Sequence, residues 1–295
     1  MNKNNIYALA LASSIFACGP AFTATMSTEA TISIGSTDYT SSDTRHAGTS
    51  QSSRTHTNGN PEYYSRSLSD ETGRTAAAAK IDYSYSYPSG GSNFDGEPHI
   101  NMATANWSNT YTGTGSNQTL NFNIDQGLLK KTSLYGEEAT RAGYGINILL
   151  NGTSIWSSHD EIGEGPYIPC PSEPCSSPSL YFNDYDDNQL TFTDVNDFSE
   201  ESYSRIYDPF TGELDLGAFG VGESFEISYV LSVYASSEYF IGNDYVMAHF
   251  GDPLDLSGGM SVSVSASAVP IPAAAYLFGS GLIGLLGFMR KQKSV

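Results

Sequence analysis

Apolar residues alternate with polar ones in several short segments of the central chain. In the segment 81–87, Ile81, Tyr83, Tyr85 and Tyr87 occupy every second position, and Asp or Ser residues lie between them. Successive side chains of a β-strand point to opposite faces of its sheet, so this period of two predicts strands with one apolar face. The same alternation recurs at Leu120, Phe122 and Ile124, from Phe225 to Val233, and at Met260, Val262 and Val264.

A two-residue turn signal separates two further predicted strands. Asn151 and Gly152 stand between the apolar stretches 146–150 and 153–156. Both residue types tolerate the positive φ that tight turns between antiparallel strands require. No segment of helical length carries a clear apolar stripe at a period of about 3.6 residues. The central chain is therefore predicted to be all-β, an antiparallel β-sandwich of jelly-roll-like type.

One region of the chain lacks the alternating pattern. Residues 36–73 contain almost no aliphatic side chain and are dense in Ser, Thr, Asn, Asp and Arg. Such a composition buries little apolar surface, so we expect a long Ser/Thr-rich loop within a single domain that covers residues 25–268. This loop either folds back onto an acidic face through Arg45, Arg54, Arg66 and Arg74 at its edge or stays solvated.

The first 24 residues have the layout of a secretory signal peptide. Lys3 precedes an apolar stretch from Ile6 to Ala17, and the small residues Ala21 and Ala24 follow. The stretch is shorter than the roughly 20 apolar residues that a membrane span needs. Segment 1–24 is therefore expected to be removed on export, with cleavage after either Ala21 or Ala24.

A second apolar segment, near the end of the sequence, has a different order of features. A short motif precedes an apolar run over residues 273–289, and a basic end follows. The motif is Val269, Pro270, Ile271 and Pro272, and the basic end contains Arg290, Lys291 and Lys293. The run is just long enough to cross a membrane as a helix, and its basic end should stay in the cytoplasm. An ordinary membrane anchor would show the same hydropathy.

Residues 269–295 resemble the sorting signal of PEP-CTERM proteins in motif, helix and basic end. Ile271 stands where that family usually has Glu. An aliphatic residue at this position resembles the VPLPA-like variants of the signal. The resemblance implies that a membrane exosortase recognises the segment and cuts near the motif. The protein would then pass through an inner-membrane intermediate, anchored transiently by the C-terminal helix, before it reaches the cell surface or is secreted.

The same resemblance suggests two roles for the exported domain. Family members that are understood tend to be linked to extracellular polysaccharide and biofilm matrix. We therefore expect a structural protein of the cell surface or extracellular matrix, and the alternative is a lectin-like, carbohydrate-binding domain. This expectation rests on analogy with the family and not on the residues of the domain.

The charge balance restricts the partners that the domain can bind. The chain has 32 Asp and Glu against 13 Lys and Arg, a net charge of −19. Such a surface repels phosphate backbones, so nucleic-acid binding is not expected and a neutral or cationic ligand is favoured. Between Ala142 and Ala268 the only base is Arg205. The acidity serves either solubility or the binding of cations.

Two small motifs predict a disulfide and a candidate calcium site. Cys170 and Cys175 lie in a proline-rich segment of an exported chain, which predicts a disulfide, and two thiolates without a nearby His fall short of a zinc shell. Asp184, Asp186 and Asn188 alternate as the oxygen ligands of calcium loops do. The fuller EF-hand pattern fails, so the alternatives are a looser Ca²⁺ site and an acidic surface loop. No other cofactor is expected.

Catalysis finds little support in the sequence, whereas sugar binding has two candidate residues. The five histidines lie in unrelated contexts and no serine has a nucleophile-elbow frame, so no enzyme is predicted. Trp107 and Trp156 are candidates for stacking on sugar rings, with core packing as the alternative. A concave row of exposed aromatic rings would favour binding, and a buried set would favour a structural role.

Overall fold

The computed structural model describes residues 24–57, 61–83, 98–132, 140–163, 182–183, 189–197, 202–237, 244–251 and 259–266. Within these ranges the chain forms antiparallel sheets and has no helix, so the all-β prediction is confirmed. A helix able to cross a membrane is accordingly not found among the described residues.

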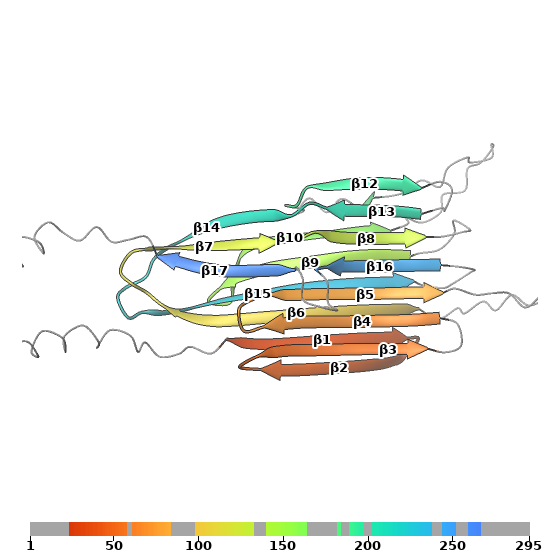
Figure 1. The fold of residues 1–295 in the computed structure, drawn as a ribbon, viewed down its shortest axis with the longest axis horizontal. Helices are drawn as coiled ribbons and strands as arrows, with labels where there is room; N and C mark the ends of the chain where they lie inside the picture. Colours follow the sequence, from red (N-terminus) through yellow and green to blue (C-terminus); the bar gives the residue numbers. More distant parts are fainter. Residues whose placement is uncertain are drawn as a thin grey trace, which may run out of the picture.

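The strands form two sheets, which we call sheet A and sheet B (Figure 1). Sheet A has seven strands, and all of its neighbouring pairs are antiparallel. In spatial order they are β11 (Phe182–Asn183), β10 (Thr153–Gly163), β9 (Thr140–Leu150), β15 (Ser224–Ser237), β6 (His99–Thr112), β1 (Thr25–Ile34) and β2 (Thr37–Arg45).

Sheet B has ten strands, again with antiparallel pairing. Its main path runs through β12 (Phe192–Asp197), β13 (Ser202–Tyr207), β8 (Gly127–Thr132), β16 (Asp244–Phe250), β5 (Thr75–Tyr83), β17 (Met260–Ala266), β7 (Asn117–Ile124) and β14 (Phe210–Ala218). Two more strands extend the sheet beside β5, namely β4 (Pro61–Asp70) and then β3 (Thr49–Thr57).

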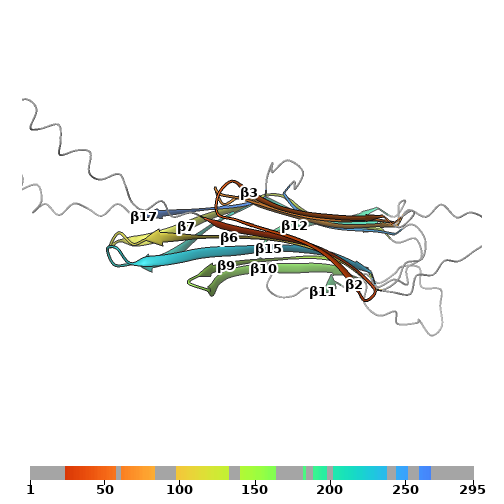
Figure 2. The ribbon, with the colours of Figure 1, turned by 90° about the horizontal axis from the view of Figure 1, so that it is seen from below.

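The two sheets lie face to face and enclose one apolar core (Figure 2). Strands β4 and β5 of sheet B lie against β6 and β15 of sheet A. The inward positions of β15 are at most 2% exposed, and they are Phe225, Ile227, Tyr229, Leu231 and Val233. Leu120, Phe122 and Ile124 of β7 and Met260 and Val262 of β17 are also buried. The strands predicted from the period of two are therefore confirmed at these three places.

The predicted strand 81–87 is confirmed as far as the structure describes it. Ile81 lies fully buried in β5, and this strand extends to Tyr83. Residues 84–87 lie outside the described ranges.

The predicted hairpin turn joins β9 and β10. Leu150 pairs with Thr153, and Asn151 and Gly152 between them have φ values of 49° and 78°. The side-chain Oδ1 of Asn151 accepts a hydrogen bond from the backbone N of Glu226 at 2.8 Å. The turn is thus also held to the neighbouring strand β15.

The prediction of a long loop over residues 36–73 is wrong. The region contains β2, β3 and β4, which pair with β1, with each other and with β5. Thr is common in strands, and the pairing of backbone amides does not require aliphatic side chains.

Buried serines explain how a polar segment forms the inner layer of a sheet. Serines at alternate positions of β3 and β4 are at most 1% exposed, namely Ser50, Ser52, Ser65, Ser67 and Ser69. The hydroxyl of Thr28 on β1 lies 3.0 Å from Ser50 Oγ and 2.9 Å from Ser52 Oγ. Ser67 Oγ donates to the carbonyl of Glu29 at 2.9 Å. Small hydroxyl groups that are hydrogen-bonded can be buried at little cost, so this edge of the core is polar.

Candidate functional site

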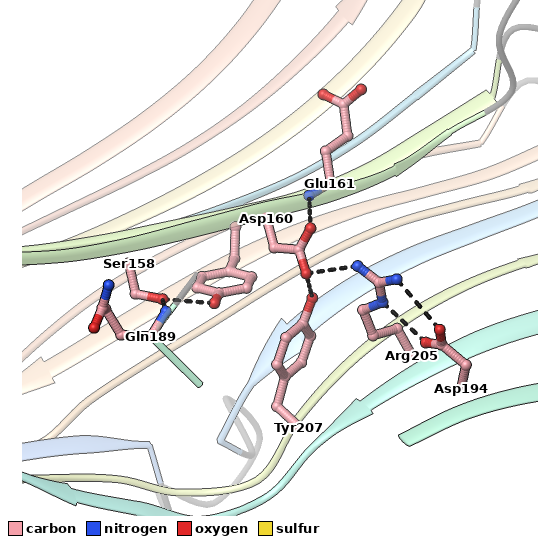
Figure 3. A network of polar contacts seen from close by, with 8 residues as sticks. Ser158, Asp160, Glu161, Gln189, Asp194, Arg205 and Tyr207 are labelled. Atoms are coloured by element: carbon pink, nitrogen blue, oxygen red, sulfur yellow. Dashed lines mark hydrogen bonds and ion pairs between the residues drawn. The ribbon is translucent and has the colours of Figure 1, made fainter. Parts of the chain in front are cut away.

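A buried ion pair links the two sheets (Figure 3). Arg205 lies on β13 of sheet B and Asp160 on β10 of sheet A. Arg205 Nη1 lies 2.8 Å from Asp160 Oδ2, and the two side chains are 2% and 1% exposed. Two charges can be buried in this way only when each is paired and hydrogen-bonded.

Arg205 has a second carboxylate partner and an aromatic ring beside it. Its Nε donates to Asp194 Oδ1 at 2.9 Å, and Asp194 faces Arg205 across the β12–β13 pair. The guanidinium carbon lies 3.9 Å from the centroid of the Phe192 ring. Burial opposes the charged form of Arg205, but its hydrogen bonds to Asp194 and Asp160 outweigh burial and raise the pKa of the guanidinium.

The remaining oxygen positions of Asp160 are also satisfied. The Tyr207 hydroxyl donates to Oδ2 at 2.7 Å, and the backbone N of Glu161 donates to Oδ1 at 2.8 Å. Burial, together with the nearby Asp160 charge, raises the pKa of Tyr207 well above the ordinary phenol value. Tyr207 therefore remains a hydrogen-bond donor over the whole neutral range.

A hydroxyl contact continues this network along β10. Tyr144 Oη lies 2.8 Å from Ser158 Oγ, which also accepts from the backbone N of Gln189 at 3.1 Å. Ser158 and Asp160 are inward positions of the same strand and are at most 3% exposed. We call the set Tyr144, Ser158, Asp160, Asp194, Arg205 and Tyr207 the cross-sheet network. Because Asp160 and Arg205 are so deeply buried, their ion pair can hold strands in place but cannot contact a dissolved substrate.

The opposite, outward face of β9, β10 and β15 carries a shallow hollow of ≈ 380 Å³. Its outward lining residues are Gly145, Asn147, Ser157, His159, Val230 and Ser232. Among the described residues, no Asp, Glu, Lys or Arg lines the hollow. An uncharged recess with mostly apolar walls and a few polar side chains is the feature of the described structure that best fits a binding site.

The two candidate stacking residues lie in different surroundings. Trp107 is 3% exposed and its ring stacks on Tyr229 at a centroid distance of 5.4 Å, so the prediction of a sugar-stacking role is wrong for Trp107. Trp156 is half-buried, and its ring packs against Phe122 at 4.9 Å and Phe210 at 5.9 Å. Core packing, the alternative reading, accounts for both rings, because an apolar ring gains most when a strand buries it.

Several predicted site residues lie outside the described residues. These are the cysteines Cys170 and Cys175, the calcium candidates Asp184, Asp186 and Asn188, the sorting motif Val269, Pro270, Ile271 and Pro272, and the basic end Arg290, Lys291 and Lys293. Signal segment 1–23 and helix 273–289 lie outside as well. In the part of the chain that is described, no three His, Cys, Asp or Glu side chains are grouped so as to hold a metal ion.

Sequence reasoning missed both the cross-sheet network and the hollow, although each had a signal. Arg205 is the only Lys or Arg between residues 142 and 268. A single cation among many acids in a region of predicted strands is a candidate for a buried ion pair. Gly143 and Gly145 stand two positions apart in β9, where glycine is disfavoured unless something approaches the backbone closely.

The comparisons with known proteins give no family for this chain. No protein-family model matches it, and no curated protein matches its sequence.

Proposed function

We propose that this chain is an exported structural protein of the bacterial cell surface or extracellular matrix. Its domain over residues 25–268 is a single β-sandwich of jelly-roll-like topology, and a membrane exosortase processes the segment 269–295. One observation carries the proposal: β17 ends at Ala266, and the motif, the apolar run and the basic end follow directly.

The geometry of the sheets suits a domain held at one end. Figure 1 shows that β1 starts and β17 ends at the same end of the long axis of the sheets. An anchor that follows Ala266 would hold this end near the membrane and direct the opposite end outward. The cross-sheet network ties sheet A to sheet B, and the sheets share an apolar core, which suits a structural role.

A processing experiment in a host that has an exosortase tests this proposal. The double variant Pro270→Ala, Pro272→Ala should remain in the membrane fraction at full length, because the motif at the cut is altered. Pro209→Ala, which changes an exposed proline between β13 and β14, should be processed like the parent. Equal processing of the parent and of the double variant would argue against exosortase sorting through this motif.

The motif of two cysteines adds one covalent element to the proposal. We propose that Cys170 and Cys175 are bridged after export, because few compartments outside the cytoplasm keep thiols reduced. Alkylation without reductant should leave both thiols of the exported protein unlabelled, and labelling of both would refute the bridge. A Ca²⁺ site at Asp184, Asp186 and Asn188 stays a prediction.

Carbohydrate binding is the second candidate function. The observation that favours it is the uncharged hollow on the outward face of sheet A, which lies on strands that the cross-sheet network fixes from the other side. Its lining of amide, hydroxyl and imidazole groups can exchange hydrogen bonds with hydroxyl groups.

A further inference from the structure

Strand β2 forms one edge of sheet A. It pairs with β1 over all nine of its residues, from Thr37 opposite Ile34 to Arg45 opposite Met26, and the register contains no bulge. Among the described residues, no strand pairs with its other side, which we call the free edge. Figure 1 shows β2 at the outer margin of the sheets, beyond β1 and β3. Every side chain of β2 is exposed or half-buried.

The turn before β2 determines which backbone groups point to the free edge. A two-residue loop joins Ile34 to Thr37, and its first residue, Gly35, has a φ of 57°. The residues that close such a loop are hydrogen-bonded to each other, so Thr37 and every second residue after it point their amide and carbonyl groups to β1. The bond from Gly35 N to the Pro98 carbonyl, at 2.9 Å, fits this alternation, because it directs the odd-numbered residues of β1 to β6. The residues of β2 that point these groups to the free edge are therefore Asp38, Thr40, Ser42 and Thr44.

Little of the molecule itself covers the free edge. Arg54 Nη2 of β3 donates to the Thr40 carbonyl at 2.8 Å, and a carbonyl oxygen can accept a second hydrogen bond. Within the described residues this is the one side-chain bond to a backbone group of the free edge. Proteins usually protect an open edge with a proline, a bulge or a lysine, and β2 has none of these.

The other edge strands are covered or interrupted. Strands β14 and β10 each have a bulge in the register with their neighbour, and β11 pairs with the end of β10. In β3, the backbone N of Gln51 donates to Asp43 Oδ2 of β2 at 3.3 Å, so β2 occupies part of that edge. Strand β12 has only six residues. In the part of the chain that the structure describes, β2 is therefore the edge best suited to accept a further strand.

We propose that β2 pairs antiparallel with β2 of a second copy of this chain, so that the two A sheets join into one. Full overlap of the two strands sets Ser41 opposite Ser41 of the second copy, on a two-fold axis. Thr40 then lies opposite Ser42, and Asp38 lies opposite Thr44. These pairs exchange backbone hydrogen bonds, because all four residues point to the free edge. The same surface of both copies forms the interface, as two-fold symmetry requires.

The charges of β2 favour this register. Full overlap sets Asp38 opposite Thr44 and Asp43 opposite Tyr39 of the second copy, so no carboxylate faces another. The hydrogen bond from Arg45 lowers the pKa of Asp43, which keeps this side chain charged at neutral pH. A register centred on Asp43 would therefore place two negative charges in direct opposition, which is destabilising.

The antiparallel arrangement determines where two copies can meet. The end of the sheets at which β1 starts in one copy lies beside the opposite end of the other copy. Copies anchored by the same end in one membrane cannot pair in this way, whereas released copies and copies on facing cells can. The inference thus deepens the structural role and rests on the proposed export only for the place of the encounter.

The oligomeric state of the full chain in mild detergent tests the pairing. An interface of one strand pair is small and should be weak, so sedimentation equilibrium is measured up to about 0.1 mM chain. We expect a reversible equilibrium of monomer and dimer. The dimer fraction should rise between about 0.05 M and about 0.5 M NaCl, because salt screens the repulsion of two copies that each carry a net charge of −19. A monomer under all of these conditions would overturn the proposal.

Ser42→Pro tests whether the dimer forms through β2. The amide of Ser42 points to the free edge, so its loss breaks no bond of the monomer, and an edge strand tolerates proline at such a position. The apparent Kd of the dimer should rise at least about tenfold, because the centre of the new ladder loses a donor. Ser42→Thr keeps the N–H and should dimerise like the parent. A dimer of unchanged strength in Ser42→Pro, such as one formed through the apolar run 273–289, would overturn the assignment to β2.

Disulfide formation tests the register and does not depend on the fold of the proline variant. Opposite residues that are not hydrogen-bonded have Cα atoms about 4.5 Å apart, which a disulfide can span. Mild oxidation should therefore link chains that carry Ser41→Cys, and the parent chain controls for the native cysteines. Thr44→Cys, which lies opposite Asp38, should give at least about tenfold less linked dimer. The experiment uses the unprocessed chain, so a chain that pairs but is never sorted refutes the proposed export alone. Equal linking of both variants, or none in Ser41→Cys, would overturn the pairing.

Discussion

Arg205 Nη1 and Asp160 Oδ2 meet at 2.8 Å between the two sheets, and both side chains are almost completely buried. The pair joins β13 of sheet B to β10 of sheet A. The net contribution of such a pair to stability is small, because both charges lose their hydration on burial. Removal of one partner alone is costly, since the other charge then remains buried without compensation.

Asp160→Asn should destabilise the fold by about 3–5 kcal/mol, because it removes the buried carboxylate that pairs with Arg205 between the two sheets. Asp43→Asn, which breaks the exposed pair with Arg45, should cost at most about 1 kcal/mol. The free energy of unfolding in urea measures both. Similar losses in the two variants would show that the buried pair has no special role.

The stability of the protein should fall above about pH 10. Burial raises the pKa of Tyr144, Tyr207 and Tyr229 beyond that of a free phenol. Above about pH 10 the unfolded chain releases phenolic protons that the folded chain retains, so the unfolded state is favoured progressively. Below this pH the contribution to stability is fully present.

Unfolding in urea between about pH 8 and about pH 11 checks this dependence. Tyr144→Phe removes one of the buried phenols, so its stability should decline less steeply with pH than that of the parent. An identical slope for the parent and the variant would contradict the assignment to buried tyrosines.

The polar layer at β1, β3 and β4 should depend on hydroxyl groups. Thr28→Val keeps the shape of the side chain but removes the buried hydroxyl that contacts Ser50 Oγ and Ser52 Oγ, which should cost about 1–3 kcal/mol. Thr31→Val on the outward face of the same strand should change stability by no more than about 0.5 kcal/mol. If Thr28→Val were neutral, the serine layer would not stabilise these strands.

Two glycines of the β9–β10 hairpin, Gly152 in the turn and Gly145 in β9, should respond oppositely to alanine. Gly152→Ala should cost about 1–2 kcal/mol, because its φ of 78° strains any residue with a Cβ atom. Gly145→Ala has open space and no positive φ, so it should be neutral or stabilise by up to about 1 kcal/mol. Thermal unfolding of both variants measures these changes in stability. If Gly152→Ala left the stability unchanged, the predicted turn geometry would be contradicted.

The period of two located the strands whose inward side chains are large and apolar. Phe225 to Val233 and Leu120 to Ile124 were found in this way because their burial is a matter of hydropathy alone. Strands β3 and β4 were missed because most of their inward residues are serines, whose burial depends on acceptors supplied by β1 and β6. Strand β2 was missed because most of its side chains are exposed and polar, so it shows no apolar face. Such partners are distant in the sequence and become visible only when the sheets are packed.

The same limit applies to the candidate site. The sequence around Trp107 does not distinguish a ring in the core from a ring on the surface. Its burial and its stacking on Tyr229 place it in the core. The ion pair of Arg205 with Asp160 requires the packing and register that bring β13 of sheet B against β10 of sheet A. Register between strands is set by the whole sheet, so the pair could not be read from either segment alone.

The intact mass of the protein recovered from the outside of a native, exosortase-encoding host tests the central claim most directly. The account predicts a species that begins at or after Phe22 and lacks residues 273–295. The account predicts in particular that the apolar run 273–289 is absent from this species. Recovery of the full 295-residue chain from that host would contradict the proposal that the protein is exported and sorted.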